Sequence, residues 1–361
     1  MSSVYGKNIK VSVFGQSHSK GIGVTIDGIP AGEKIDMIEL QNFMNRRAPG
    51  NAKFATQRKE PDAPEFLSGI VNDSTCGAPV SAVIFNTNAH SDDYKNIIDI
   101  PRPAHADFTA QIKYKGFQDV AGGGHFSGRL TAPLCIAGGI AKQILERKGI
   151  QIFAHILRIK NICDDTFDKV NPNIDMLKTI AKKQFPVIND EKGDIMMQEI
   201  EKARMDCNSV GGVIECVAVG LMPGVGDPMF DGLENKISSA VFGVPAVKGI
   251  EFGNGFDSTE LYGSQNNDEF YFDDDAIKTR TNNHGGILGG ISSGMPLYFK
   301  VALKPTASIA KEQNSVSFSE KKNTKLVIKG RHDPCIVPRA VPVIEAVTAL
   351  AIYDSILENN N

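Results

Sequence analysis

The stretch Asn282–Ser308, NNHGGILGGISSGMPLYFKVALKPTAS, carries three local signals in succession. Five glycines fall within residues 285–294, and glycine accepts positive φ and lets the backbone lie close to a flat or bulky group. The apolar run Pro296–Leu303 has the β-branched and aromatic content of a strand. The loop Lys304–Ser308 then offers an ammonium, two hydroxyls and backbone N–H groups, which suit a phosphate. Together these signals predict a bound phosphorylated cofactor; the alternative is a glycine-rich hairpin followed by a solvated lysine.

Composition narrows the class of protein. The chain has 361 residues, of which 41% are hydrophobic and 22% charged, and its net charge is −3. A charge this small argues against a general nucleic-acid binder, in which a basic excess would show. No uninterrupted apolar run reaches the roughly 18 residues that a membrane-spanning helix needs, and the N-terminal residues lack a signal-peptide pattern. We therefore expect a globular, cytoplasmic protein that does not associate with a membrane.

Neither a metal site nor a domain boundary is evident in the sequence. The six cysteines are scattered, without a CxxC pair or zinc-type histidine spacing, so reduced thiols and no metal are expected. No linker rich in Pro, Gly or Ser, no internal repeat and no low-complexity tract divides the chain. We expect a single domain over residues 1–361.

Strand and helix signals alternate without the regular order of a parallel α/β protein. Strands are predicted at 11–14, 22–26, 150–162, 213–219, 247–252 and 325–329, with a hairpin over 66–88. Helices are predicted from Asp36 to the Pro49-Gly50 pair, around 136–145, and over 174–185, 194–206, 233–241 and 341–357. The last of these is apolar on nearly every side, so it should be buried centrally. Strands in hairpin-like pairs with a few long helices between them predict an α+β fold.

One glycine-rich segment argues against a dinucleotide site. GNGFDS at 253–258 lacks the third glycine and the strand-to-helix setting of the Rossmann fingerprint. The phosphate-type loop at the end of the opening stretch therefore remains the better candidate for a phosphorylated ligand.

Ionisable residues occupy three loops, where chemistry tends to be found. His18 lies in the turn GQSHSKG between two predicted strands, although a turn-stabilising or exposed histidine is the commoner case. His105 lies in DIPRPAHAD, where two prolines around Arg102 stiffen the backbone. Asp333 belongs to GRHDPC, directly before the buried last helix, so this loop must lie against the core.

Basic residues gather near the end of the first predicted helix. Arg46 and Arg47 lie in its last turn, where cations also stabilise the helix dipole. Three more basic residues follow in the next loop: Lys53, Arg58 and Lys59. Arg129 ends a glycine- and serine-rich loop that opens another predicted helix, a setting that favours an anionic partner. The clustering indicates a small anionic ligand rather than a polymer.

Several of these segments, in this order, resemble the chorismate synthase family. They are FGQSHSKGIGVTIDGIPAG, the stretch from 46 to 62 that ends in TQRKEPD, RPAHAD, GILGGISSGMPL with KPTAS, and GRHDPC with RAVPVIEA. The resemblance extends from about residue 8 to the C-terminus. It implies a single-domain α+β sandwich, with long central helices between antiparallel sheets, that assembles as a homotetramer.

The resemblance also implies a reaction. Such an enzyme is a carbon–oxygen lyase that converts 5-enolpyruvylshikimate 3-phosphate to chorismate and phosphate by 1,4-anti elimination. This is the last common step of aromatic amino-acid biosynthesis. Reduced FMN lends an electron and regains it, so there is no net redox change, and an external flavin reductant is expected.

Two alternatives stay open beside this implied activity. One is another flavin-dependent oxidoreductase, which usually carries a nicotinamide site, and the sequence shows no motif for one. The other is a non-enzymatic flavin- or phosphate-binding protein, which has no need of histidines and an aspartate on rigid loops.

Matched residue by residue, the resemblance implies three groups of site residues. In the catalytic group, His18 protonates the leaving phosphate, His105 holds or supplies a proton to the reduced flavin, and Asp333 accepts one from the flavin's N5 side. The cofactor-binding group comprises His125, Phe126, Ser127, Ala246, Gly289, Lys304, Pro305, Thr306, Ala307, Ser308 and Arg331. The substrate-binding group comprises Arg46, Arg47, Lys53, Arg102 and Arg129.

The chain departs from the commoner family pattern at the phosphate pocket. GGGHFSGRLT stands where GGGRSSARET is common, so His125 and Phe126 replace an arginine and a serine. Ala48 and Lys53 also stand where arginines are usual. The pocket is therefore expected to be less positively charged than in most of the family.

Overall fold

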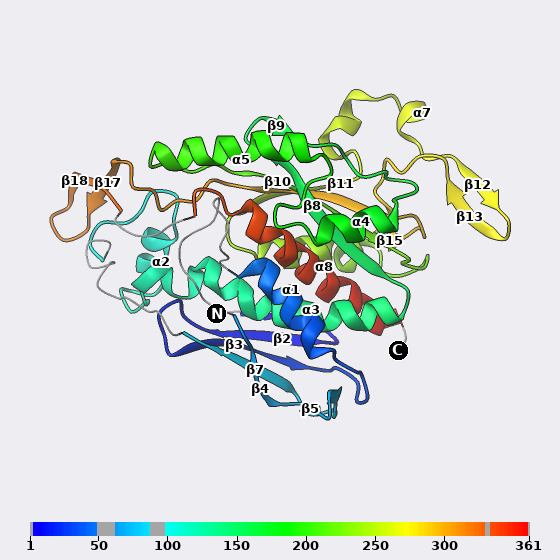
Figure 1. Ribbon diagram of the computed structural model, residues 1–361, viewed down its shortest axis with the longest axis horizontal. Coiled ribbons are helices and arrows are strands. Elements are labelled where there is room, and N and C mark those ends of the chain that lie inside the picture. Colours follow the sequence, from blue (N-terminus) through cyan, green and yellow to red (C-terminus); the bar gives the residue numbers. More distant parts are fainter. Residues whose placement is uncertain (1–2, 49–61, 87–97, 329–332, 360–361) are drawn as a thin grey trace.

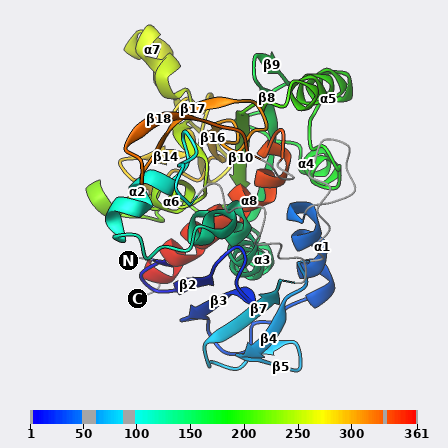
Figure 2. The same cartoon turned by 90° about the vertical axis from the view of Figure 1, so that its left-hand side faces the viewer.

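A computed structural model describes residues 3–48, 62–86, 98–328 and 333–359 of the chain. Two five-stranded sheets have the strand orders β1-β2-β3-β7-β4 and β11-β16-β10-β8-β9. Each neighbouring pair within them is antiparallel. Helices α3 and α8 lie between the two sheets (Figures 1 and 2). The prediction of an α+β protein is confirmed.

The elements have the following bounds. The first sheet contains β1 (Val4–Tyr5), β2 (Lys10–Gly15), β3 (Gly21–Asp27), β4 (Glu65–Ser68) and β7 (Val80–Phe85). The second contains β8 (Gln151–Ile159), β9 (Ile162–Cys163), β10 (Gly212–Val219), β11 (Val247–Phe252) and β16 (Leu297–Leu303). Small hairpins pair β5 (Ile70–Val71) with β6 (Ser74–Thr75), β12 (Phe270–Asp273) with β13 (Ala276–Thr279), β14 (Ile287–Leu288) with β15 (Ile291–Ser292), and β17 (Gln313–Ser317) with β18 (Lys322–Leu326). The α-helices are α1 (Met37–Arg47), α2 (Asp107–Lys113), α3 (Thr131–Arg147), α4 (Ile174–Ala181), α5 (Asp190–Met205), α6 (Leu233–Phe242), α7 (Gly263–Asn266) and α8 (Val337–Asn359).

The two central helices cross very closely. A Cβ added to Gly138 of α3 would lie 2.3 Å from the Cβ of Ala346 on α8, so only glycine fits at this crossing. By length and apolar composition α8 could cross a membrane, but 94% of the segment that meets this test is buried inside the protein. The apolar character of α8 is therefore accounted for by its place in the core, as the sequence predicted.

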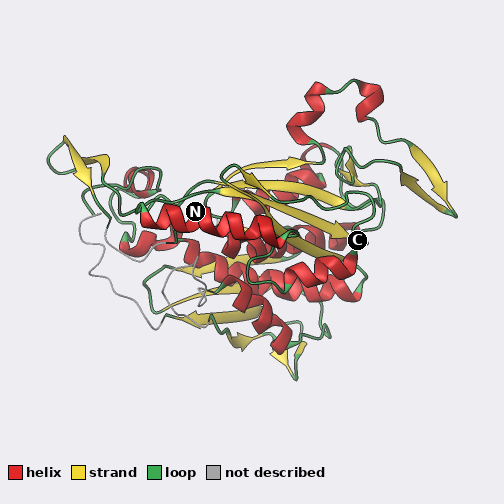
Figure 3. Cartoon of the chain, turned by 45° about the horizontal axis from the view of Figure 1, so that its top comes forward, coloured by secondary structure: helices red, strands yellow, loops and turns green. Residues whose placement is uncertain are grey.

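Helices and hairpins around this core define the two ends of the molecule. Helix α1 packs on α3 and α8, and α4 and α5 cover the second sheet beside β8. The hairpin β17–β18 lies near α2 at one end, and the β12–β13 hairpin projects at the opposite end (Figures 1 and 3).

Several sequence predictions differ from the structure in detail: for example, α4 ends at Ala181 rather than at 185, and α5 begins at Asp190 rather than at 194. The predicted hairpin over 66–88 is divided: β4 pairs with β7, while β5 and β6 form a hairpin of their own. Gly69 separates β4 from β5 and has a φ of +87°. Only glycine fits at this position, because its backbone passes too close to Val80 for any Cβ. The strand predicted at 325–329 begins earlier, as β18 (Lys322–Leu326), which pairs with β17. Helix α8 begins four residues earlier than predicted, because proline is tolerated in a first helical turn and Pro338 occupies that turn.

Candidate active site

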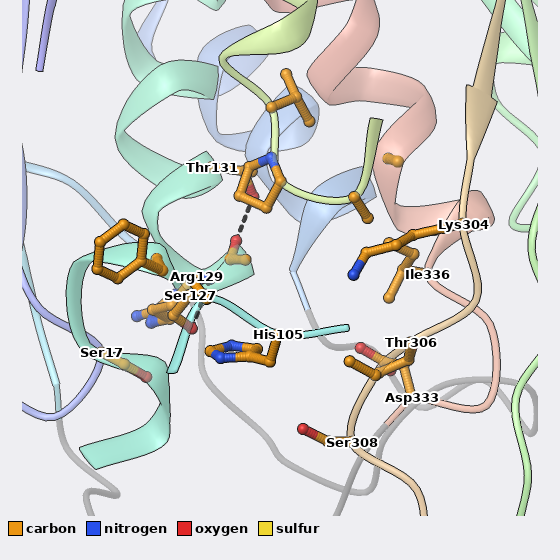
Figure 4. A pocket seen from close by; sticks show the side chains of 18 of the residues that line it. Ser17, His105, Ser127, Arg129, Thr131, Lys304, Thr306, Ser308, Asp333 and Ile336 are labelled. Atoms are coloured by element: carbon orange, nitrogen blue, oxygen red, sulfur yellow. Dashed lines mark hydrogen bonds between the residues drawn. The ribbon is translucent and has the colours of Figure 1, made fainter. Parts of the chain in front are cut away.

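A cavity of about 550 Å³ lies where the loops before α2 and α3 meet the loop after β16 and the first turns of α8 (Figure 4). This volume is typical of a small-molecule site. Most of the residues that the sequence singled out line it: Arg47, Arg102, His105, His125, Phe126, Ser127, Arg129, Ala246, Lys304, Pro305, Thr306, Ala307, Ser308 and Asp333. Segments far apart in the chain therefore meet at one place.

One carboxylate holds both Arg102 and His105. The guanidinium of Arg102 donates from Nε and Nη2 to the two carboxylate oxygens of Asp107, each at 2.7 Å. The Nδ1 atom of His105 lies 2.5 Å from Oδ1 of Asp107. Burial by itself would raise the pKa of Asp107, but the hydrogen bonds from Arg102 and His105 outweigh it and lower that pKa. Asp107 is therefore an ionised acceptor between the two.

A glycine loop runs beside both catalytic histidine candidates. Gly122 and Gly123 have φ angles of +60° and +88°, which non-glycine residues rarely adopt. A Cβ on Gly122 would lie 2.3 Å from Cε1 of His18, and one on Gly123 would lie 3.0 Å from Nε2 of His105. His18 does not itself line the cavity, but its neighbour Ser17 does. The loop thus brings backbone against both imidazoles because it has no side chains there.

Arg47 and Arg129 share a buried counter-ion, Asp62. Nη1 of Arg47 lies 2.5 Å from one carboxylate oxygen of Asp62, and Nη1 of Arg129 donates to the other. Burial opposes ionisation of Asp62, but the two guanidinium groups outweigh it and lower its pKa. Arg47 also donates from Nε to the hydroxyl of Thr131 at 3.0 Å, which fixes the end of α1 against the start of α3.

Asp333 forms an ion pair with a residue of α8. Nη1 of Arg339 lies 2.5 Å from Oδ2 of Asp333, and Nε of Arg339 donates to the carbonyl of Arg47 at 3.1 Å. Arg339 lines the cavity beside Asp333. The first turns of α8 therefore orient the carboxylate that precedes them.

The loop Lys304–Ser308 forms another wall. The hydroxyl of Ser308 accepts from Nη1 of Arg102 at 3.1 Å, and the ammonium of Lys304 donates to the carbonyl of Ala104. Burial, and after it the neighbouring Lys248, lowers the pKa of Lys304. The buried hydroxyl of Thr306 has no hydrogen-bond partner in the part of the chain that the structure describes. The loop thus combines a cation with a hydroxyl that is free to bind a ligand.

His125 joins the glycine loop to the N-terminal strands. Its Nδ1 lies 2.8 Å from the carbonyl of Gly15, and its Nε2 lies 2.7 Å from the hydroxyl of Ser3. A carbonyl oxygen only accepts, so Nδ1 carries a proton. The ring of Phe126, the next residue, is tilted against that of Tyr114 at 6.2 Å.

Some predicted site residues lie elsewhere. Arg46 points to Glu345 of α8, with two hydrogen bonds of 2.7 and 2.8 Å, and does not line the cavity. Gly289 belongs to the turn between β14 and β15 and does not line it either. Lys53 and Arg331 fall outside the described residues, as do Arg58 and Lys59.

The glycine-rich part of the opening stretch has a structural role in the described chain. A Cβ on Gly285 would lie 2.5 Å from both the N of Gly253 and the O of Tyr298. These glycines thus allow close packing of backbone, while the loop Lys304–Ser308 after β16 lines the cavity.

Sequence reasoning gave no role to three charged residues of this site: Asp62, Asp107 and Arg339. Each stands inside a segment that carried the family resemblance, in TQRKEPD, RPAHAD and RAVPVIEA. Their partners come from other segments or depend on the bend of the loop, so no local pattern reveals them. In the described part of the chain, no group of three or more His, Cys, Asp or Glu side chains is arranged to hold a metal ion.

Comparisons with known proteins agree on one family. The chorismate synthase family model matches residues 9–357. The chorismate synthase of Lancefieldella parvula is 46% identical over 99% of this chain and 96% of its own length. That of Thermococcus kodakarensis is 44% identical over 98% and 97%. A solved structure described as a crystal structure of chorismate synthase has a TM-score of 0.76 and 25% identity, and it covers 98% of this chain and 93% of its own.

Proposed function

Because the chain belongs to the chorismate synthase family, we infer that the cavity is the place where it carries out that family's reaction. The enzyme is a lyase of the shikimate pathway. It eliminates phosphate from 5-enolpyruvylshikimate 3-phosphate and forms chorismate without net redox change. The observation that carries the location is the convergence of Arg47, Arg102, Arg129, His105 and the loop 304–308 on one cavity.

The family is flavin-dependent, and the cavity fits a phosphorylated flavin. The buried hydroxyl of Thr306 has no partner among the described residues, and the ammonium of Lys304 lies in the same loop. We propose that FMN is the flavin, and that its phosphate binds this loop. Ser127, Ala246 and the neighbouring backbone would border the rest of the flavin. Bound in reduced form, it would supply the electron that cleavage of the C–O bond needs and then recover it.

The cations of the cavity would bind and stabilise the departing phosphate. Arg47 and Arg129 are fixed by Asp62, and Arg102 by Asp107, so their positions are set before the substrate arrives. Groups that are preorganised toward developing negative charge give a large part of catalysis in a site that excludes water. We also propose Arg46, Lys53 and Arg331 as members of the binding groups to which sequence matching assigned them.

Proton movements would fall to His18, His105 and Asp333. We propose that His18, whose ring lies against Gly122, protonates the leaving phosphate. His105 would hold or supply a proton to the flavin through Nε2, because its Nδ1 is bound to Asp107. Asp333, oriented by Arg339, would accept a proton on the flavin's N5 side.

One anaerobic assay tests this function. Pre-reduced FMN and 5-enolpyruvylshikimate 3-phosphate are added, and phosphate release and flavin absorbance are followed together. Phosphate should appear while the flavin stays reduced. His18→Ala should lower kcat by about 10²–10⁴-fold while FMN and substrate still bind. His284→Ala, in the loop between β13 and β14 and outside the cavity, should leave kcat unchanged. Stoichiometric flavin oxidation, or full turnover without flavin, contradicts the proposal.

The remaining features are proposals that rest on the family. We propose that the chain is one domain with the β-α-β sandwich of the family, assembles as a homotetramer, works in the cytoplasm and receives reduced flavin from an external reductant. The two sheets with α3 and α8 between them support the sandwich.

A further inference from the structure

We propose that Asp107 is a positioning residue of the active site, which fixes the tautomer and orientation of His105 so that Nε2 is the nitrogen presented to the ligand. The inference rests on the proposed role of His105. It adds a residue to which neither the sequence nor the family resemblance gave a function.

The first step concerns which proton His105 carries. Two groups approach its Nδ1: a carboxylate oxygen of Asp107 at 2.5 Å and Nη2 of Arg102 at 3.0 Å. An ionised carboxylate only accepts a hydrogen bond, whereas a guanidinium only donates. Nδ1 therefore cannot satisfy both. The contact with Asp107 is shorter by half an ångström, and Nη2 of Arg102 already donates to Asp107 at 2.7 Å, so Nδ1 carries the proton.

The second step concerns the rigidity of Asp107 itself. Its carboxylate accepts from Nε and Nη2 of Arg102 in a two-pronged contact, and Oδ2 also accepts from the backbone N–H of Arg102 at 3.0 Å. The residue is the first of α2 and is 9% exposed. Two prolines flank Arg102, and Ala104 holds a left-handed φ of +59°. The bend places a carboxylate two residues beyond His105 directly against its ring.

The third step concerns the other ring nitrogen. With Nδ1 held by Asp107, Nε2 lies on the ring edge that borders Gly123, and His105 lines the cavity (Figure 4). The neutral ring then offers a lone pair at Nε2, and the protonated ring offers an N–H there. A hydrogen bond on one imidazole nitrogen determines the chemistry of the other. Asp107 also links His105 to the loop 304–308, because Arg102, which it holds, donates to the hydroxyl of Ser308 at 3.1 Å.

The experiment is a double-mutant cycle with a direct measurement of the tautomer. Wild type, Asp107→Asn, His105→Ala and the double variant are assayed for phosphate release with pre-reduced FMN. In Asp107→Asn, the side-chain amide can donate a hydrogen bond to Nδ1 of His105. This favours the tautomer of His105 that carries its proton on Nε2. Asp107→Asn should lower kcat by about 10²-fold or more, yet by less than about twofold in the His105→Ala background, since coupled residues are not additive. Asp99→Asn is the matched control. The Asp99 carboxylate accepts from the hydroxyl of Ser317 and holds the start of the loop before α2, outside the cavity. The kcat of this variant should not change.

Two further measurements keep the proposal testable if Asp107→Asn fails to fold. Ring ¹⁵N shifts of His105 in the wild-type protein, assigned by their loss in His105→Ala, should show the proton on Nδ1 of the neutral ring. Asp107→Glu, which keeps the charge, should retain more kcat than Asp107→Asn. A proton on Nε2, equal losses of kcat in both backgrounds, or a change in KM alone would overturn the proposal. Full activity of His105→Ala would instead remove the role of His105 in the proposed function.

Discussion

Glu345 gives the most quantitative prediction, because its carboxylate is fully buried between two cations. It accepts two hydrogen bonds from Arg46 and one from Lys142 at 2.7 Å. The backbone N–H of Ala154 in β8 donates to it at 3.2 Å. The carboxylate thus links α1, α3, α8 and the second sheet. The perturbation is Glu345→Gln, which keeps the shape and removes the charge.

The magnitude follows from the pKa of the carboxyl. Burial alone would raise it, but Arg46 and Lys142 outweigh burial and lower the pKa of Glu345 from 4.5 to about 2. By linkage this corresponds to roughly 3 kcal/mol. Removing one partner of a buried ion pair typically costs about 3–5 kcal/mol, because the other charge is left uncompensated. For a chain of 361 residues, a loss of about 3 kcal/mol lowers Tm by roughly 4 °C.

The pH dependence has a definite sign. A carboxyl whose folded pKa is depressed contributes its full stability above the unfolded pKa and loses it as the pH falls through the folded one. The wild-type protein should therefore lose part of its stability from Glu345 between about pH 4.5 and pH 2, and Glu345→Gln should not. Thermal melts of wild type and Glu345→Gln at pH 7 and at roughly pH 3.5 give the difference in Tm and its change with pH.

The control separates charge from packing. Replacing the carboxylate together with both cations, Glu345→Leu with Arg46→Met and Lys142→Met, should cost less than Glu345→Gln alone, since a buried ion pair can often be exchanged for apolar groups of similar volume. Equal melting temperatures of wild type and Glu345→Gln at pH 7 would refute the reasoning. If Arg46→Met lowers Tm and leaves the substrate KM unchanged, Arg46 acts in the fold rather than in binding.

Two further predictions test the site and the core. Gly123→Ala should lower kcat by at least about tenfold, because its new Cβ would lie 3.0 Å from Nε2 of His105. It should also lower Tm, because a φ of +88° is strained for a residue with a Cβ; wild-type turnover would contradict the tight contact. Burial lowers the pKa of His155, but the neighbouring carboxylates of Asp164 and Glu215 outweigh it and raise that pKa. The stabilisation by His155 is therefore complete below the unfolded pKa of about 6.5 and is lost as the pH rises through the folded value. The Tm difference between wild type and His155→Gln should shrink as the pH is raised above about 6.5, and a constant difference would exclude this linkage.

Sequence reasoning was most successful where the signal is local. Asp36 was predicted to begin a helix, and its carboxylate accepts from the backbone N–H groups of Ile38 and Glu39, each at 2.9 Å. The last helix was predicted to be central from its apolar composition alone, and α8 is buried between the sheets. Periodicity and capping are properties of neighbouring residues, so one sequence is enough to find them.

Pairings between distant segments could not be predicted in the same way. Arg46 and Arg47 are adjacent and chemically equal, yet one contacts a carboxylate of α8 and the other contacts Asp62 and the cavity. The 3.6-residue period of a helix turns neighbouring side chains about 100° apart, and only the packing of α1 on α3 and α8 decides what each meets. For the same reason the basic cluster indicated an anion site but not which of its arginines would line the cavity.

The charge pairing of the cavity has a consequence for how it binds anions. In the described part of the chain, Arg47 and Arg129 share Asp62, Arg102 pairs with Asp107, and Arg339 pairs with Asp333. Asp62 joins two arginines from different segments, whereas Asp107 and Asp333 stand five and six residues from their arginines and meet them through a bend of the chain, so the cations take these positions as the chain folds. An incoming phosphate does not have to order these side chains, because the aspartates have already fixed them, and the entropic cost of binding falls accordingly.

The aspartates also leave the cluster with little excess positive charge, so a phosphate group that has become a free product is not held as strongly as bare arginines would hold it. Preorganisation without strong retention is the property that an enzyme needs when it must bind a phosphate ester and then release phosphate.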